Sequence, residues 1–192
     1  DINVSMKDFI VEDNSIRFGL AAVKNVGTSL VDSIIKNREF DGRFKSLEEF
    51  CCRIDYKDFN RRSIESLIKA CTFDSVIENR ARAVDSLEQI LEVASRRQKS
   101  IAVGQGSLFS SDGSEDFQVQ GSQIEDWSDK ERLVYEREVL GFYVSGHPLD
   151  DWESTITRFT NSNSQNLSQI SGVKKARMAG LIPSSKTRTS RM

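Results

Sequence analysis

Near its beginning the chain alternates apolar and polar residues with a period of two. Asp13 and Asn14, in the middle of this stretch, are typical of a turn. The alternating apolar residues are Phe9, Val11, Ile16 and Phe18. This pattern predicts a short β-hairpin over residues 8–18.

After residue 20 the apolar residues recur with the period of an α-helix. The first apolar stripe consists of Leu30, Val31, Ile34 and Ile35. Ser46 and Glu49 have the spacing of a capping box, so a second helix is expected to begin there. Asn60 is a good N-cap for a third helix. The residues expected to face inward on that helix are Ile64, Leu67, Ile68 and Cys71.

The longest predicted helix covers residues 79–101 and ends in a basic turn, which suits the negative end of the helix dipole. Residues 102–126 are rich in Gly, Ser, Gln and Asp and are expected to form a mobile loop. A second capping box, Ser128 with Glu131, predicts another helix. From Val173 alternating residues predict a strand, the first of a sheet that the chain does not complete. The pattern as a whole predicts a mainly α fold.

Composition places the chain among soluble proteins. It has 192 residues, 38% hydrophobic and 29% charged, which suffices for one or two small domains. No apolar run approaches the roughly 20 residues of a membrane span. The chain opens at Asp1 without an initiator methionine and ends at Met192 in a basic stretch, so we expect a piece of a longer protein.

Charge is unevenly distributed along the chain. Residues 17–69 carry eleven Lys and Arg against eight Asp and Glu, residues 112–138 are acidic, and residues 172–192 are basic. Such segregation is typical of surfaces with separate partners.

Residues 23–30 have the layout of a helix-hairpin-helix motif. Gly27 would let backbone amides approach a phosphate closely, and the following helix N-terminus adds partial positive charge. Asn25 stands where many such hairpins have another Gly, and Asn tolerates the left-handed conformation. The DNA-contacting candidates are Lys24, Asn25, Val26, Gly27 and Thr28. The alternative is an ordinary turn between two helices.

A second hairpin of the same kind spans residues 54–67. It lacks Gly, so its contacts to phosphate would come from side chains, for which Lys57, Asn60, Arg61 and Arg62 are the candidates. Taken alone, this stretch also fits a solvated basic helix start.

An apolar pair lies within the polar loop. Leu108 and Phe109 have no periodic apolar neighbours, and such a pair is typical of a peptide that docks into a partner's pocket. Gln105 and Ser107 complete the candidate peptide. The alternative is a loop that folds back on its own domain.

The residues present exclude several kinds of chemistry. The three cysteines, Cys51, Cys52 and Cys71, form no metal-binding pattern and are expected to be reduced thiols of a cytoplasmic protein. His147 precedes a proline without a catalytic partner and is expected to be a turn residue. We therefore predict neither a catalytic nor a metal-binding residue in this chain.

The ordered set of motifs resembles the alpha subunits of bacterial replicative DNA polymerase III. The most specific motif is EVLGFYVSGHPLD over residues 138–150. The others lie at residues 16–20, 23–27, 44–50, 66–70, 73–75, 96–98, 104–109 and 127. The resemblance implies a nucleotidyltransferase whose palm aspartates and magnesium ions lie outside this chain. No cofactor is then expected in the segment itself.

The resemblance also implies a map of the segment. Residues 1–78 correspond to the end of the fingers with a tandem helix-hairpin-helix, and residues 79–126 to the helix and loop that bind the sliding clamp. Residues 127–171 form a helical connector, and residues 172–192 contribute the first strand of a truncated OB-fold. The expected partners are duplex DNA, the sliding clamp through residues 105–109, and other replicase subunits, with no membrane. The alternative is a stand-alone helix-hairpin-helix adaptor for DNA binding or repair, without polymerase activity.

Overall fold

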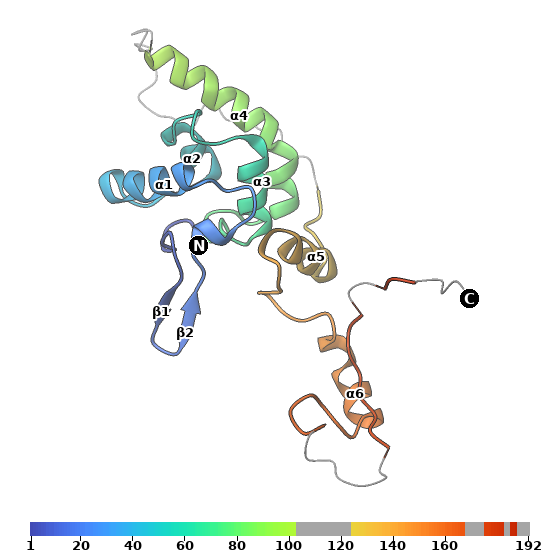
Figure 1. Ribbon diagram of the computed structural model, residues 1–192. Coiled ribbons are helices and arrows are strands. Elements are labelled where there is room, and N and C mark those ends of the chain that lie inside the picture. Colours follow the sequence, from blue (N-terminus) through green and yellow to red (C-terminus); the bar gives the residue numbers. More distant parts are fainter. Residues whose placement is uncertain (103–123, 168–174, 183–184, 188–192) are drawn as a thin grey trace, which may run out of the picture. The chain divides into compact units, whose positions relative to one another are not determined.

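The computed structural model describes residues 1–102, 124–167, 175–182 and 185–187, which fall into two compact units (Figure 1). The first unit is Asp1–Tyr143 and the second is Val144–Met192. The mainly α fold predicted from the apolar pattern is confirmed in the first unit, with a small β-hairpin at its beginning. The predicted clamp peptide, residues 105–109, lies outside the described residues.

The hairpin consists of two short antiparallel strands, β1 (Ile10–Glu12) and β2 (Ser15–Arg17). Val11 pairs with Ile16 across the two strands, as the alternation requires. Asp13 adopts φ 49° in the turn, a conformation that Asp tolerates better than most residues. The prediction of a hairpin with its turn at Asp13 and Asn14 is confirmed.

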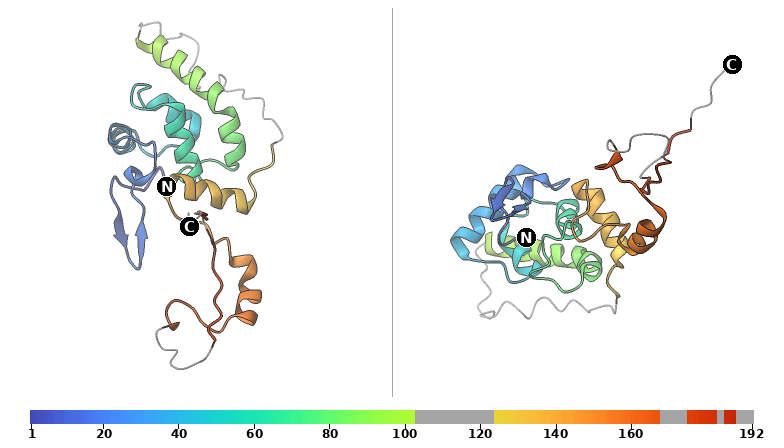
Figure 2. Two further views of the ribbon diagram at one scale, coloured as in Figure 1. Left: turned by 45° about the vertical axis from the view of Figure 1, so that its right-hand side comes forward. Right: turned by 90° about the horizontal axis from the view of Figure 1, so that it is seen from below.

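Six α-helices and two short 3₁₀ helices occur in the described ranges. In the first unit they are η1 (Leu20–Ala22), α1 (Thr28–Asp41), α2 (Leu47–Arg53), α3 (Arg61–Lys69), α4 (Arg80–Ala102) and α5 (Asp129–Leu140). The long helix α4 packs against both α2 and α3, and α5 packs against α3 (Figures 1 and 2). These contacts bury one apolar face of α4, which includes Leu87, Ile90 and Ala94.

Three aromatic side chains form the centre of the core in the first unit. Phe50 of α2 makes edge-on contacts with Phe44 and Phe73, with ring centroids 5.1 Å and 5.0 Å apart. All three are fully buried, and such pairs add to the free energy gained by burial of apolar area. The core therefore joins α2 to the chain on both sides of it.

The helix starts follow the predicted capping residues. Ser46 accepts a hydrogen bond from the Glu49 amide at 3.1 Å, but the Glu49 carboxylate accepts from the Lys45 amide instead of the Ser46 amide. Ser128 and Glu131 form the complete capping box. Asn60 caps α3 as predicted.

The prediction that Cys71 continues the inward face of α3 is wrong. The helix ends at Lys69, and Cys71 adopts φ 60°, outside the helical region. Its thiol donates a hydrogen bond to the fully buried Glu136 carboxylate of α5 at 3.0 Å. The helical period continues past Lys69 in the sequence, but the backbone leaves the helix because the next residues turn back toward α5.

The second unit has little regular structure. It contains η2 (Asp150–Trp152) and α6 (Glu153–Phe159). The Arg177 amide donates to the Asn161 side chain at 2.8 Å, so residues near 177 run beside the end of α6. No strand is formed by residues 175–182 or 185–187, so the predicted OB-fold strand is not observed where the chain is described. Asn161 bonds to both the amide and the carbonyl of Arg177, but a strand requires a ladder of backbone bonds, and none extends along the described residues 175–182.

Candidate nucleic-acid interface

The first hairpin connects η1 to α1 through residues 23–27. Its turn is closed by a hydrogen bond from the Val26 amide to the Val23 carbonyl at 3.3 Å. Asn25 takes the left-handed conformation, with φ 64°, which its side chain tolerates. Its carboxamide nitrogen donates to Ser66 Oγ of α3 at 3.0 Å, so the first hairpin is attached to the second motif.

Gly27 is the N-cap of α1, but the reason for a glycine there differs from the expected one. Its φ of −78° and ψ of 156° are extended and strain no residue type, and a Cβ atom on it would meet nothing within 4 Å. The backbone therefore does not require glycine. Because Gly27 has no side chain, the space beside the first amides of α1 is open. These amides have no acceptor within the helix and no side-chain cap.

The second hairpin connects α2 to α3 through residues 54–60. The Asp58 amide donates to the Asp55 carbonyl at 2.9 Å, and the Lys57 amide donates to the Asp55 carboxylate at 3.0 Å. These two bonds form a compact turn without glycine. The Asp58 carboxylate accepts from Ser29 Oγ at 2.7 Å, which brings the two hairpins into contact at the start of α1.

Two arginines stand at the start of α3. Arg61 and Arg62 are exposed, and neither guanidinium group forms a hydrogen bond or an ion pair with any residue in the described part of the chain. A guanidinium group fits the geometry of a phosphate better than any other side chain. Both are therefore available to a ligand.

Both hairpins contribute to one pocket of about 360 Å³. Asn25 comes from the first hairpin, whereas Arg61 and Arg62 come from the second. The other lining residues are Glu65, Ser66, Lys69, Glu138 and Val139. The structure thus brings together three of the predicted DNA-contacting residues, although Asn25 lies more than thirty positions before Arg61 and Arg62 in the sequence.

The other cation of this pocket already has partners. Lys69 Nζ lies 3.0 Å from the Glu65 carboxylate and 3.4 Å from the Glu138 carboxylate. Partial burial by itself lowers the pKa of Lys69, but these two carboxylates raise it overall. Lys69 therefore stays charged and compensates the acidic side of the pocket, which leaves the two arginines as its uncompensated cations.

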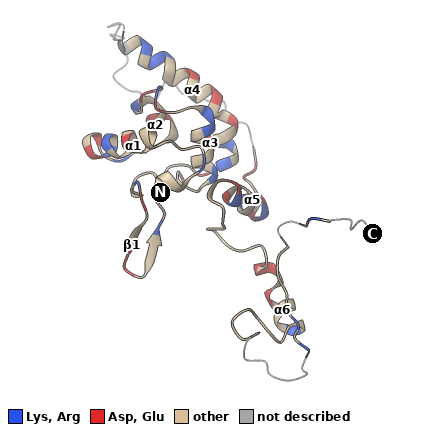
Figure 3. Ribbon diagram, viewed as in Figure 1, with Lys and Arg blue, Asp and Glu red and all other residues tan. Residues whose placement is uncertain are grey.

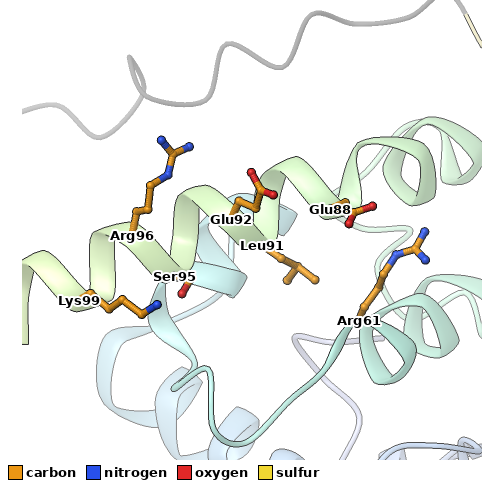
Figure 4. A pocket seen from close by; sticks show the side chains of 7 residues that line it. All are labelled: Arg61, Glu88, Leu91, Glu92, Ser95, Arg96 and Lys99. Atoms are coloured by element: carbon orange, nitrogen blue, oxygen red, sulfur yellow. The ribbon is translucent and has the colours of Figure 1, made fainter.

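A second hollow, of about 500 Å³, lies between the start of α3 and the outer face of α4 (Figure 4). Arg61 lines it from α3, so this arginine belongs to both hollows. The residues from α4 are Glu88, Leu91, Glu92, Ser95, Arg96 and Lys99. Lys and Arg positions occur on both α3 and α4, but α4 also carries acidic positions (Figure 3), so the second hollow has mixed charge.

Three of the predicted contact residues have internal roles. Lys24 Nζ donates to the Glu138 carbonyl at 2.7 Å and its amide to the Val139 carbonyl, so it binds the end of α5. Val26 is half-buried against the core. Asn60 uses its side-chain oxygen to cap α3. By contrast, Thr28 and Lys57 are exposed.

The candidate interface also involves two residues that the sequence did not predict as DNA contacts. Ser66 receives the Asn25 hydrogen bond, and the Gln98 side chain of α4 binds the second hairpin. Both are polar residues on helical faces, and only the tertiary packing distinguishes them from their exposed neighbours.

The described residues hold no group of three or more His, Cys, Asp or Glu side chains placed to bind a metal ion. Within the same ranges, no helix combines the length and the apolar surface needed to cross a membrane. The thiol of Cys71 is bound to a carboxylate, and burial together with that bond raises its pKa to about 12. This thiol is therefore a poor nucleophile near neutral pH.

Comparisons with known proteins agree with the hairpins. Residues 1–83 match the family model described as a helix-hairpin-helix motif. The chain is 41% identical over 167 residues to the DNA polymerase III subunit alpha of Borreliella burgdorferi, which covers 85% of this chain and 14% of that protein. It is 34% identical over 194 residues to the same subunit of Vibrio cholerae, covering 100% of this chain and 17% of the relative.

A third relative, the DNA polymerase III subunit alpha of Deinococcus radiodurans, is 43% identical over 156 residues, covering 80% of this chain and 12% of that protein. The resemblance identified from the motifs is thereby confirmed over most of the chain. The chain spans less than one fifth of the length of these curated relatives.

Proposed function

We propose that this chain, a segment similar to the alpha subunit of bacterial DNA polymerase III, holds duplex DNA by its backbone within such a polymerase. The observation that carries the proposal is the pocket in which Asn25 of the first hairpin meets Arg61 and Arg62 of the second. A phosphate at this pocket would be bound by guanidinium groups, and one at the start of α1 by free amides. Neither contact depends on base sequence.

The extent of the similarity supports the polymerase over a stand-alone adaptor. The helix-hairpin-helix match ends at residue 83, whereas the alignment with the Vibrio cholerae subunit continues over the whole chain. A protein that shared only the hairpins would not require residues 84–192 to be similar as well. Because these relatives are polymerase subunits of bacteria, we also propose that the protein acts in the bacterial cytoplasm.

The chemistry of synthesis would then be performed by other parts of the full-length protein. Two-metal phosphoryl transfer needs carboxylates that hold magnesium ions, and we assign that role to palm aspartates outside this chain. The segment contributes binding. We also propose that residues 105–109 bind the sliding clamp and that the full protein contacts other replicase subunits.

Removal of the two arginines tests DNA binding. We expect Arg61→Ala with Arg62→Ala to weaken binding of the 192-residue chain to a duplex, as measured by fluorescence anisotropy at several salt concentrations. If each arginine neutralises one phosphate, the slope of log K against log salt becomes shallower by about 1.8.

The matched control is Lys36→Ala with Arg43→Ala, which removes two exposed cations that line neither hollow. The control should keep most of the parent's affinity and slope. An equal loss in both double variants would mean that net charge alone determines binding, and the proposed site would then be wrong.

A further inference from the structure

Gln98, near the end of α4, makes four hydrogen bonds with one side chain. Its Nε2 donates to the carbonyl oxygens of Ile54, Cys51 and Cys52 at 2.7, 3.1 and 3.2 Å. Its Oε1 accepts from the Tyr56 amide at 3.1 Å. The two hydrogens of the carboxamide are thus shared among three acceptors, and its oxygen is also used.

These partners lie where α2 ends and the second hairpin begins. The last carbonyls of a helix have no partner within the helix, and Gln98 satisfies two of those of α2. Asp55 lies between Ile54 and Tyr56, so the two bonds from Gln98 fix the backbone on both sides of it. Asp55 in turn closes the turn by accepting from the Lys57 and Asp58 amides.

We infer that Gln98 is a positioning residue for DNA binding, because it holds the second hairpin in the position from which its cations face the ligand. The inference rests on the function proposed above. The bonds within residues 55–58 shape the turn, and Ser29 of α1 attaches it at Asp58. The carboxamide of Gln98 attaches the beginning of the turn to α4, across more than forty positions of sequence.

Loss of this attachment would affect affinity more than the fold. The helices α2 and α4 would still pack through buried apolar residues such as Phe50 and Leu87. The hairpin, however, would have more conformations, and DNA would have to order it on binding. Ordering a loop and its side chains reduces affinity, so we expect a loss of about 3- to 10-fold.

The test compares two substitutions in the 192-residue chain. Gln98→Met keeps the length of the side chain and removes all four hydrogen bonds. Gln98→Glu keeps an acceptor for the Tyr56 amide but loses the donors to three carbonyls. Duplex affinity should fall in both variants. The loss should be at least as large for Gln98→Glu, because its carboxylate is repelled by the three carbonyl oxygens and by the DNA.

Leu133→Ala is the matched control for stability. Leu133 is buried and belongs to α5, outside both hairpins, so its truncation should lower the free energy of unfolding without changing a hairpin residue. At a temperature at which all variants are folded, it should bind DNA as the parent does. A double-mutant cycle of Gln98→Met with Lys57→Ala should be non-additive, because Lys57 contributes fully only when the hairpin is held.

Three results would overturn the inference: parent-like affinity of Gln98→Met, an equal loss in Leu133→Ala, or additive effects with Lys57→Ala. Amide hydrogen exchange of the parent decides the case if both Gln98 variants unfold, since an unprotected Tyr56 amide would exclude the bond to Gln98. DNA binding that depends on Arg61 and Arg62 but not on Gln98 would refute this inference alone. A parent that binds no DNA would refute the proposed function as well.

Discussion

At the scale of single residues, Asn25 combines two properties that few residue types share. It holds a left-handed backbone conformation in the first hairpin and also donates a side-chain hydrogen bond to Ser66. Glycine would adopt the same conformation but could not make the bond. Most other residues would be strained by about 1–2 kcal/mol in that conformation. Asn25 therefore both shapes the first hairpin and attaches it to α3.

We expect Asn25→Ala to lower the free energy of unfolding by about 2–3 kcal/mol, because it adds backbone strain to the loss of one hydrogen bond. Asn25→Gly keeps the conformation and loses only the bond, so the loss should be about 1 kcal/mol, partly from the flexibility of glycine in the unfolded chain. Urea unfolding of both variants measures the difference. Equal losses would show that the left-handed backbone costs nothing here.

At the scale of secondary-structure elements, the sequence predicted what depends on near neighbours. The hairpin turn at Asp13, the start of α3 at Asn60 and the capping box at Ser128 were all predicted, because each arises within a few residues. The helix-hairpin-helix layout of residues 23–30 also follows from local sequence, and it lies within residues 1–83, which match the helix-hairpin-helix model.

What the sequence could not predict depends on contacts between distant residues. Glu136 is fully buried, although glutamate is rarely buried without a partner, and it is bound by the Cys71 thiol and lies 3.6 Å from Arg80. Lys24 was predicted to face DNA because basic residues in hairpins often do, but the end of α5 provides it with a carbonyl. Neither partner is close in sequence, so no local pattern indicates them.

The start of α1 offers a test at this scale, because α1 lacks the side-chain cap found at α2, α3 and α5. Serine at position 27 would cap the helix by accepting from its free amides. We expect Gly27→Ser to raise the free energy of unfolding by a few tenths of a kcal/mol or leave it unchanged. The same amides would then be less available to phosphate, so affinity for duplex DNA should fall.

Urea unfolding of the Gly27→Ser protein should show an equal or higher free energy of unfolding, and DNA titration of the same protein should show a lower affinity. Thr28→Ser is the control, since it changes the neighbouring exposed residue without adding a cap. If Gly27→Ser binds DNA as tightly as the parent, phosphate does not use the start of α1. Binding would then be confined to the arginine pocket.

At the scale of the whole molecule, the chain joins a helical block proposed to bind DNA to a peptide proposed to bind a second partner. The helix α4 leads from the second hairpin at Gln98 to Ala102, three positions before the peptide at Gln105. DNA and clamp would therefore be held by neighbouring parts of one chain. Two weak contacts linked in this way retain a partner far better than either does alone, because the second contact forms at a high effective concentration.

The peptide itself supplies the last prediction. Leu108 and Phe109 are apolar residues in a polar stretch, and burial of each in a partner's pocket is worth about 1.5–3 kcal/mol before ordering costs are subtracted. We expect Leu108→Ala with Phe109→Ala to abolish measurable binding to the sliding clamp. Binding to free duplex should remain near that of the parent, because these residues belong to neither hairpin.

The two affinities should be measured by titration with clamp alone, with duplex alone, and with clamp loaded on DNA. Ser110→Ala with Ser111→Ala is the matched control, since it changes two adjacent polar residues of the same loop. On loaded clamp, the parent should be retained longer than its affinity for clamp alone or duplex alone predicts. Leu108→Ala with Phe109→Ala should lose this gain because the clamp contact is lost. Arg61→Ala with Arg62→Ala should lose it because the DNA contact is lost. Clamp binding that survives the loss of Leu108 and Phe109 would place the clamp contact elsewhere in the chain. If clamp binding is lost but retention on loaded clamp is not, retention comes from the DNA contacts of Arg61 and Arg62 alone, and it should be as sensitive to salt as the binding of free duplex.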